Sequence, residues 1–153
     1  RKVLVGLLVF QGLSVGELQL LEPRHVDLEQ GLVHIPGTRR SNGRVLRLLE
    51  CQLAPLREYL CGYHQDVVFT TAQGSRDLTN LLTALMERLR RTNPGVKNAT
   101  QLRMSVISHW LRGRDVRVVQ HMAGHRHVSS TERYRLDRLH TLQHDVESFH
   151  PLE

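Results

Sequence analysis

Two short runs of alternating apolar and polar residues, set among helical patterns, constrain the fold of this chain most strongly. Residues 31–35 (GLVHI) and 44–48 (RVLRL) alternate with a period of two, and Asn42-Gly43 lies in the segment between them. An Asn-Gly pair between strand-like runs is a strong signal for a β-hairpin. We therefore expect one antiparallel hairpin whose tip carries three arginines, Arg39, Arg40 and Arg44.

Helical periodicity accounts for most of the remaining sequence. Ser14 precedes an apolar stripe, and Glu17 lies three residues after Ser14. This pair has the spacing of a capping box. An apolar run at residues 67–69 favours a further short strand. We expect a fold of the α+β class, mainly α, with a small antiparallel sheet. The expected helices cover residues 3–10, 14–21, 54–63, 77–91, 98 or 100 to 111, 115–122, 130–134 and 137–148.

The length of the chain, 153 residues, is typical of one compact domain, and we expect residues 1–153 to form a single domain. The longest apolar run, residues 3–10, is much shorter than the roughly 20 residues that cross a membrane. Cys51 and Cys61 are too few for a disulfide framework. Without a recognisable signal peptide, a cytoplasmic location is expected. Because the chain opens inside a helical pattern, we expect it to be part of a longer protein.

The excess of basic residues indicates an anionic partner. The formal charge is +6, and 19 of the 21 basic residues are arginine. A guanidinium group fits phosphate in a bidentate way, whereas lysine acts as a point charge. A genome that favours arginine codons would explain the same excess, so charge alone does not identify nucleic acid as the partner.

The segment from Thr100 to Tyr134 carries the most informative motifs. Thr100-Gln-Leu-Arg103 opens one expected helix, Met122-Ala-Gly-His125 closes another, and Tyr134 follows His125 by nine residues. This arrangement resembles the catalytic domain of the tyrosine recombinase (phage integrase) family. The signature of that family comprises His-x-Leu-Arg, then Leu-Gly-His, then a nucleophilic tyrosine nine residues after that histidine.

The resemblance extends towards the amino terminus. Residues 11–18 (QGLSVGEL) are similar to the Thr-Gly-Leu-Arg-Ile-Ser-Glu-Leu motif of the family. Residues 33–48 are similar to its hairpin with a catalytic lysine. The resemblance covers nearly the whole chain and implies a helical recombinase catalytic core without the amino-terminal DNA-clamping domain that family members usually carry.

The resemblance also implies a set of catalytic roles. Tyr134 would be the nucleophile that forms a covalent tyrosyl–DNA intermediate, and Arg103 would clamp the phosphate. His125 would be a phosphate contact or a proton-transfer group, and Arg39, with Arg40 as an alternative, would stand in for the lysine. Such chemistry places negative charge on phosphoryl oxygens, which fixed cationic donors stabilise. It requires no metal ion and no other cofactor.

Three positions depart from the family pattern. Ser14 replaces the first catalytic arginine, and Thr100 replaces the histidine that precedes Arg103. Arg39 can bind phosphate, but arginine stays protonated above pH 12 and is a poor general acid. We therefore expect DNA cleavage by this chain to be very slow or absent, while phosphate binding persists.

Three functions remain open. The first is a site-specific recombinase, active or weakly active, that cleaves and rejoins DNA strands. The second is a catalytically inactive recombinase-like protein that binds DNA or a partner recombinase. The third is an unrelated helical binding module, in which Tyr134 is an ordinary half-buried tyrosine, Arg103 pairs with Asp115 or Glu132, and His125 caps a helix.

Double-stranded DNA is the expected partner, and neither a membrane nor a small-molecule substrate is expected. A zinc site at His121, His125 and His127 is disfavoured because Gly124 ends the helix between them. An apolar stripe after Tyr134 suggests a homo-oligomer or a partner recombinase on DNA, and in a bacterium the protein would lie with the nucleoid. The residues expected to contact DNA are Arg39, Arg40, Arg44, Arg103 and Arg126; those of the stripe are Leu136, Leu139, Leu142, Val146 and Phe149.

Overall fold

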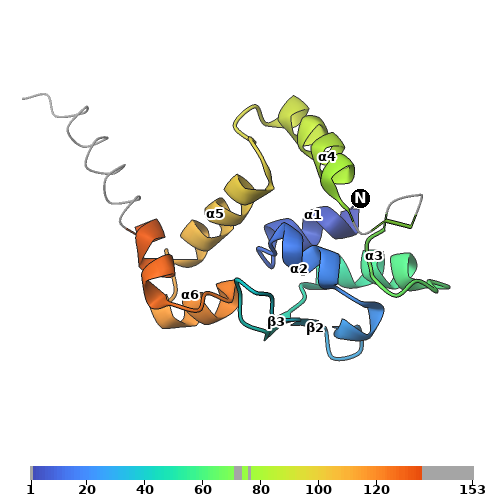
Figure 1. Cartoon of the computed structure of the whole chain (residues 1–153), viewed down its shortest axis with the longest axis horizontal. Helices are drawn as coiled ribbons and strands as arrows, with labels where there is room; N and C mark the ends of the chain where they lie inside the picture. The colour runs from blue at the N-terminus through green and yellow to red at the C-terminus, as the bar shows by residue number, and fades with distance from the viewer. Residues whose placement is uncertain (1, 71–73, 76, 136–153) are drawn as a thin grey trace, which may run out of the picture.

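The computed structural model describes residues 2–70, 74–75 and 77–135, and over these ranges it is mainly helical (Figure 1). The helix expected over 137–148 and the apolar stripe after Tyr134 lie outside the described residues. None of the described helices is both long enough and apolar enough to span a membrane. The α-helices are α1 (Lys2–Val9), α2 (Val15–Leu20), α3 (Glu50–Leu60), α4 (Thr79–Thr92), α5 (Ala99–Trp110) and α6 (Val116–Ala123), followed by a helix over 128–135.

The expected hairpin is confirmed and belongs to a three-stranded antiparallel sheet. Strand β2 (Leu32–Ile35) pairs with β3 (Arg44–Arg47), and β1 (Val26–Asp27) adds to the other edge of β2. Alternation places Val33, Ile35 and Leu46 in the core, while the residues between them face solvent. Strand β1 and the preceding 3-10 turn, η1 (Pro23–His25), were not predicted, because two residues are too few for a periodic signal.

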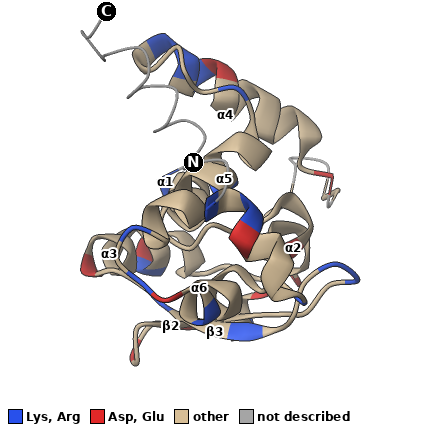
Figure 2. Ribbon diagram, turned by 90° about the vertical axis from the view of Figure 1, so that its left-hand side faces the viewer, with Lys and Arg blue, Asp and Glu red and all other residues tan. Residues whose placement is uncertain are grey.

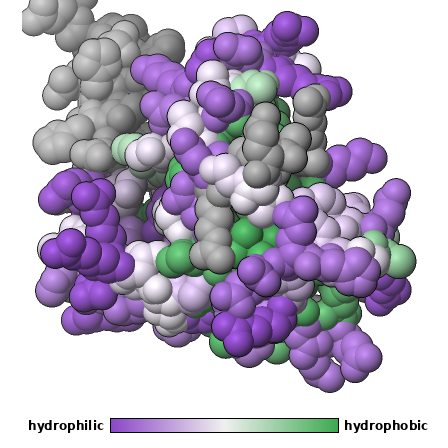
Figure 3. Space-filling view, turned by 45° about the vertical axis from the view of Figure 1, so that its right-hand side comes forward, coloured by the Kyte–Doolittle hydropathy of each residue, from purple (hydrophilic) through white to green (hydrophobic). Residues whose placement is uncertain are grey.

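The main core forms around α1. Leu4, Leu7 and Leu8 on this helix are almost completely buried, and α1 contacts both α3 and α5. A second, smaller cluster joins α5 to α6 through Ile107, Trp110, Val119 and Ala123, with Tyr134 packed against it. Helix α5 therefore links the main core to the end of the chain that carries Tyr134. On the face drawn in Figure 3 the surface is mostly hydrophilic, and most of the hydrophobic residues that show lie in its middle and lower part.

The strand expected at residues 67–69 is wrong, although all three residues are buried. The backbone of Val68 is satisfied without a neighbouring strand: its N–H donates to the Leu21 carbonyl at 2.7 Å. The hydroxyls of Tyr59 and Tyr63 each donate to its carbonyl oxygen at 2.9 Å. The apolar run indicates only that these residues are buried, and a buried loop gives the same pattern as a buried strand.

Helix boundaries otherwise differ from the sequence expectation by a few residues. Helix α3 begins at Glu50, four residues before the expected start, with Pro55 inside it. Asp77 lies one residue before the N-cap of α4, and its carboxylate accepts a hydrogen bond from the Thr79 N–H at 2.9 Å. Asn98 and Asp115 cap α5 and α6, as the sequence predicts.

Candidate active site

A buried carboxylate, Glu17, lies at the centre of the candidate site. Its Oε1 accepts a hydrogen bond from Arg44 Nη1 at 2.5 Å. Its Oε2 accepts from the backbone N–H of Ser14 at 2.8 Å and lies 3.3 Å from Arg103 Nη1. The side chains of Glu17 and Arg44 are completely buried, whereas that of Arg103 is 13% exposed. Glu17 thus holds together α2, β3 and α5.

The charge of Glu17 is maintained by these neighbours. Burial alone would raise the pKa of this carboxyl group, but the hydrogen bond and positive charge of Arg44 outweigh burial. The N–H of Ser14 and the charge of Arg103 act in the same direction, so the pKa is lowered from its usual 4.5. Glu17 is therefore an anion at neutral pH, and a buried anion needs such partners.

Arg103 is fixed from three sides. Besides its contact with Glu17, its Nη1 donates to the carbonyl of Gly12 and its Nη2 donates to the carbonyl of Ala123 at 2.6 Å. Gly12 has a φ of +58°, and a Cβ at this position would come within 3.2 Å of the Trp110 ring. A glycine is required there for the backbone to approach α5 and reach Arg103. The guanidinium is held in place before any ligand arrives.

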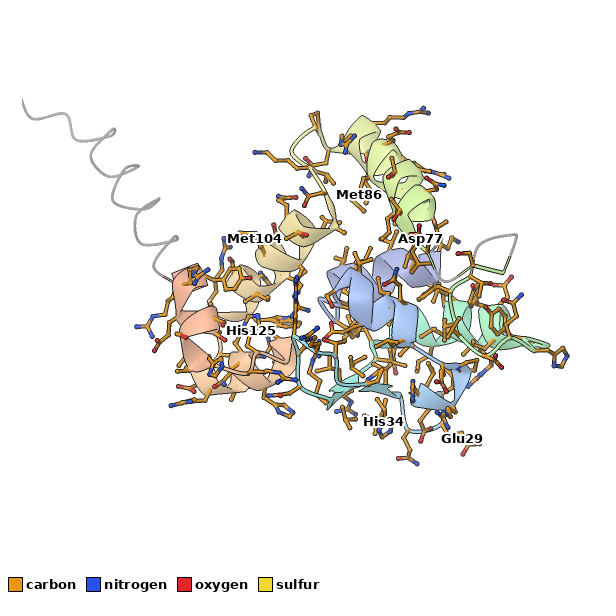
Figure 4. All side chains as sticks on the ribbon, viewed as in Figure 1. Glu29, His34, Asp77, Met86, Met104 and His125 are labelled. Carbon is orange, nitrogen blue, oxygen red and sulfur yellow. The ribbon has the colours of Figure 1, made fainter. Side chains whose placement is uncertain are left out.

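His125 and Tyr134 lie side by side. Helix α6 ends at Gly124, whose left-handed φ of 70° turns the chain so that His125 leaves the helix axis. The following helix, over 128–135, then returns Thr131 and Tyr134 towards the imidazole. The rings of His125 and Tyr134 are stacked, with centroids 5.8 Å apart and planes inclined by 8°. Figure 4 shows His125 among α5, α6 and this last helix.

Electrostatic coupling joins these two residues to Arg103. The pKa of His125 is lowered to about 4, first by burial and then by the positive charges of Arg103 and Arg44, with Glu17 opposing. The pKa of Arg103 is lowered by burial, and the charges of Glu17 and Tyr134 oppose that effect. Arg103 thus interacts with both members of the stacked pair. The structure brings Tyr134, His125 and Arg103 together at one place.

We predict that His125 titrates far below the range of an ordinary histidine. Its folded-state pKa of about 4 lies below its usual 6.5, so the unfolded chain binds its proton first as the pH falls. The contribution of His125 to stability is therefore complete above about pH 6.5 and declines between 6.5 and 4. An NMR titration of the His125 ring protons measures this directly. A midpoint near 6.5 in the folded protein would contradict the prediction.

The tip of the hairpin is attached to the loop that carries His125. The Asn42 N–H donates to the Gly124 carbonyl at 2.9 Å, and Arg126 Nη2 donates to the Thr38 carbonyl at 3.1 Å. Arg39 and Arg40 at this tip are exposed, and among the described residues their side chains make no hydrogen bond or ion pair. Both arginines are therefore beside the site and free to bind an anion.

The prediction that Arg44 contacts DNA is wrong. The structure buries its side chain completely, pairs it with Glu17 and lets Nε donate to the Met122 carbonyl at 2.7 Å. Residue 44 lies on β3 opposite Ile35, so alternation turns it inward rather than to the tip. Arg126, also expected to contact DNA, is exposed, although its Nη2 donates a hydrogen bond to the Thr38 carbonyl.

Of the two degenerate positions, Ser14 lies next to the assembled residues. Ser14 is the N-cap of α2, and its hydroxyl accepts from the Glu17 N–H at 3.3 Å. Its backbone shares Glu17 Oε2 with Arg103, so a side chain at position 14 starts beside the guanidinium. Thr100 is exposed in the first turn of α5, one turn before Arg103.

Sequence reasoning missed Glu17 and Thr131 as parts of this site and gave Arg44 a different role in it. In the sequence, the capping box is a sufficient reason for a glutamate at position 17. Nothing in the sequence therefore indicated that Glu17 pairs with two distant arginines. Arg103 pairs with Glu17 and not with Asp115 or Glu132, the alternatives left open above. Over the described ranges, no group of three or more His, Cys, Asp or Glu side chains is arranged to hold a metal ion.

Comparison with known proteins identifies the family. The profile of the phage integrase family matches residues 1–139. The tyrosine recombinase XerC of Pseudomonas entomophila is 31% identical over 98% of this chain and 52% of its own length. The tyrosine recombinase XerA of Pyrococcus furiosus is 28% identical over 99% of this chain and 55% of its own length. The chain therefore belongs to the phage integrase family and spans about half the length of the curated relatives it matches.

Solved structures show the same fold. The crystal structure of XerA recombinase superposes with a TM-score of 0.76 at 23% identity, covering 99% of this chain and 58% of that one. XerH recombinase, in a post-cleavage complex with a palindromic difH substrate, superposes with a TM-score of 0.73 at 22% identity, covering 95% of this chain and 44% of that one. The α+β, mainly helical fold expected from the sequence is thus confirmed as that of the recombinase catalytic domain.

Proposed function

We propose that residues 1–153 act as the catalytic-type domain of a site-specific tyrosine recombinase, which cleaves and rejoins DNA strands. The observation that carries this proposal is the convergence of Tyr134, His125 and Arg103 beside the buried Glu17. These residues are separated by up to 117 positions in the sequence, and the fold brings them to one place. Structural relatives solved in complex with DNA, among them the Tn1549 transposon integrase and XerH recombinase, support double-stranded DNA as the substrate.

The geometry suits attack by a tyrosine on a phosphodiester. The Tyr134 oxygen forms a bond to phosphorus, the bond to one deoxyribose oxygen breaks, Tyr134 releases its proton and the leaving oxygen takes one up. Arg103, already oriented, stabilises charge on the phosphoryl oxygens. Arg39 and Arg40 add positive charge from the hairpin tip but are poor proton donors.

Two substitutions make this reaction slow. A serine at position 14 offers one neutral hydroxyl, which is already engaged in capping α2. One arginine at a phosphoryl-transfer transition state is worth about 10³–10⁵ in rate in other enzymes. Ser14 and Thr100 therefore favour a second candidate, an inactive recombinase-like protein that binds DNA or a partner recombinase.

A nicked suicide DNA substrate distinguishes the two candidates. Cleavage next to the nick releases a short fragment, so the tyrosyl–DNA product accumulates. We expect a slowly forming, denaturant-resistant adduct with the wild-type chain and none with Tyr134→Phe. The two chains should bind DNA with equal affinity. Binding without any adduct supports the inactive candidate, and absence of salt-dependent binding contradicts both.

The basic residues are distributed over several elements, including α4 and the region of α6 and β3 (Figure 2). Net charge therefore does not locate the DNA surface, and the exposed tip beside His125 supports a DNA surface there. We predict that Arg39→Ala and Arg40→Ala each weaken DNA binding and each lower the slope of log K against log salt by about one.

Arg88→Ala is the matched control for these two variants. Arg88 is exposed on α4, and α4 lies at the top of the molecule whereas α6 lies at its lower left (Figure 1). We expect the salt slope with Arg88→Ala to equal that of the wild type. Equal losses from all three variants would show that binding depends on net charge and not on the hairpin tip.

Assembly on DNA and location are further parts of the proposal. An apolar pocket of about 650 Å³ between α1, β3 and α5 supports contact with a second protomer or a partner recombinase; Phe10, Leu49 and Trp110 are among its lining residues. We expect concentration-dependent sedimentation that disappears when the residues after His140 are deleted. Strictly monomeric behaviour of both chains would contradict the oligomer. A protein acting on a bacterial chromosome would work in the cytoplasm with the nucleoid.

A further inference from the structure

Thr131 is a completely buried polar residue that contacts the candidate site. Its Oγ1 lies 2.8 Å from Nδ1 of His125, and within the described part of the chain this is the only hydrogen bond of the hydroxyl. The spacing of three residues places Thr131 and Tyr134 on the same face of the helix over 128–135. One helix face therefore contacts the imidazole twice, through a hydrogen bond and through ring stacking.

The direction of that hydrogen bond follows from satisfaction of the buried hydroxyl. A buried O–H proton without an acceptor costs about 1–3 kcal/mol, so the hydroxyl of Thr131 must donate to the acceptor within reach. That acceptor is Nδ1, which accepts only when it carries no proton. If Nδ1–H were the donor instead, the Thr131 proton would have no acceptor among the described residues. The proton of the neutral imidazole therefore lies on Nε2.

We propose that Thr131 is a positioning residue, which holds His125 in the tautomer protonated at Nε2 and presents that N–H to a phosphoryl oxygen. The phosphate as ligand of His125 rests on the proposed recombinase function. The assignment of the tautomer does not, because it follows from the hydrogen bond with Thr131. Nε2 has no hydrogen-bond partner within the described ranges and is available to a ligand. His125 then acts as a donor to the phosphate and not as the base that removes the proton of Tyr134.

Burial and the groups that face His125 keep its ring neutral, while Thr131 determines its tautomer. Arg103 from α5 and Arg44 from β3 disfavour a proton on both nitrogens, and Glu17 from α2 opposes them. Tyr134 covers one face of the ring. The imidazole is thus neutral at pH 7, and in a neutral ring the partner of one nitrogen decides which nitrogen carries the proton.

Nitrogen-15 NMR of the histidine rings in the full chain tests this inference without DNA. At pH 7 we expect the shift of an unprotonated nitrogen for His125 Nδ1 and that of a protonated nitrogen for Nε2. Thr131→Val keeps the size of the side chain and removes the hydroxyl, so both shifts should move towards the average of the two tautomers. Thr131→Ser retains the hydroxyl and should restore the wild-type shifts. A proton on Nδ1 in the wild type would overturn the inference.

Adduct formation on the nicked substrate provides the functional comparison. We expect Thr131→Val to lower the rate of adduct formation by about 10-fold or more with little change in DNA affinity, and Thr131→Ser to retain most of the rate. Equal rates in all three chains would overturn the positioning role. If the wild type forms no adduct, the proposed cleavage fails, while the ring shifts still decide the tautomer. If Thr131→Val does not fold, the wild-type shifts and Thr131→Ser decide it.

Discussion

A chain that combines Ser14→Arg with Thr100→His is expected to form the covalent adduct faster than the wild type by about 10³-fold or more. The backbone of residue 14 shares a carboxylate oxygen with Arg103, so an arginine introduced there starts beside the guanidinium that would clamp the phosphate. A histidine at position 100 lies one turn before Arg103 and adds a second donor. Each change places a donor where negative charge develops in the transition state.

The same variant should be less stable than the wild type. Arginine at position 14 removes the hydroxyl that caps α2, and loss of such a cap costs about 0.5–2 kcal/mol. Rates of adduct formation for the double variant and both single variants, measured with thermal melting, separate the gain in chemistry from the loss of folding. Ser14→Lys is the matched control, since it restores a point charge without the planar fork. A folded double variant that binds DNA but cleaves no faster would contradict the assignment of position 14.

Replacing Glu17 with glutamine is expected to reduce the free energy of unfolding by about 3–5 kcal/mol, because it leaves the buried Arg44 guanidinium without its counter-charge. The hydrogen bonds to Arg103 and to Ser14 are weakened in the same step. Chemical denaturation of the two chains at pH 7 measures the difference. Comparable stability of Glu17→Gln and the wild type would show that the ion pair is not needed for the fold.

Glu22→Gln is the matched control for that variant. Glu22 pairs with Arg24 at 2.5 Å, but the Arg24 side chain is 77% exposed, and an exposed pair contributes about 0–1 kcal/mol.

The pH dependence of stability adds a second check on Glu17. Since the pKa of Glu17 is lowered in the folded state, its stabilisation is complete above about pH 4.5 and is lost as the pH falls through the folded-state value. The gap between Glu17→Gln and the wild type should therefore close only in acid.

Local signals in the sequence were sufficient for most of the fold. The Asn-Gly turn and the alternating runs predicted β2 and β3, and one capping box and two further helix caps predicted α2, α5 and α6 within one or two residues. These signals depend on neighbours in the chain. The run at residues 67–69 misled because burial there is provided by distant side chains, including two tyrosines that satisfy the backbone of Val68.

The site was predicted only where a motif marked it. Tyr134, His125 and Arg103 came from a resemblance between ordered motifs, and the structure brings them together. Arg44 was placed on the wrong side of the sheet, because a charged residue next to two exposed arginines suggests a surface role. Only tertiary pairing with Glu17 reveals that it is buried. Buried charges joined across the chain have no periodic signature, so neither that pair nor the contact of Thr131 could be derived from spacing.

The central claim is that the phenolic oxygen of Tyr134 attacks the DNA phosphate, and peptide mapping of the adduct tests it most directly. The wild-type chain and the Ser14→Arg, Thr100→His variant are incubated with the nicked substrate, the adduct is digested with nuclease and protease, and the nucleotide-bearing peptide is sequenced by mass spectrometry. We predict that the nucleotide is attached to Tyr134 in both chains. A nucleotide on any other residue, or a folded, DNA-binding double variant that forms no adduct, would contradict the claim.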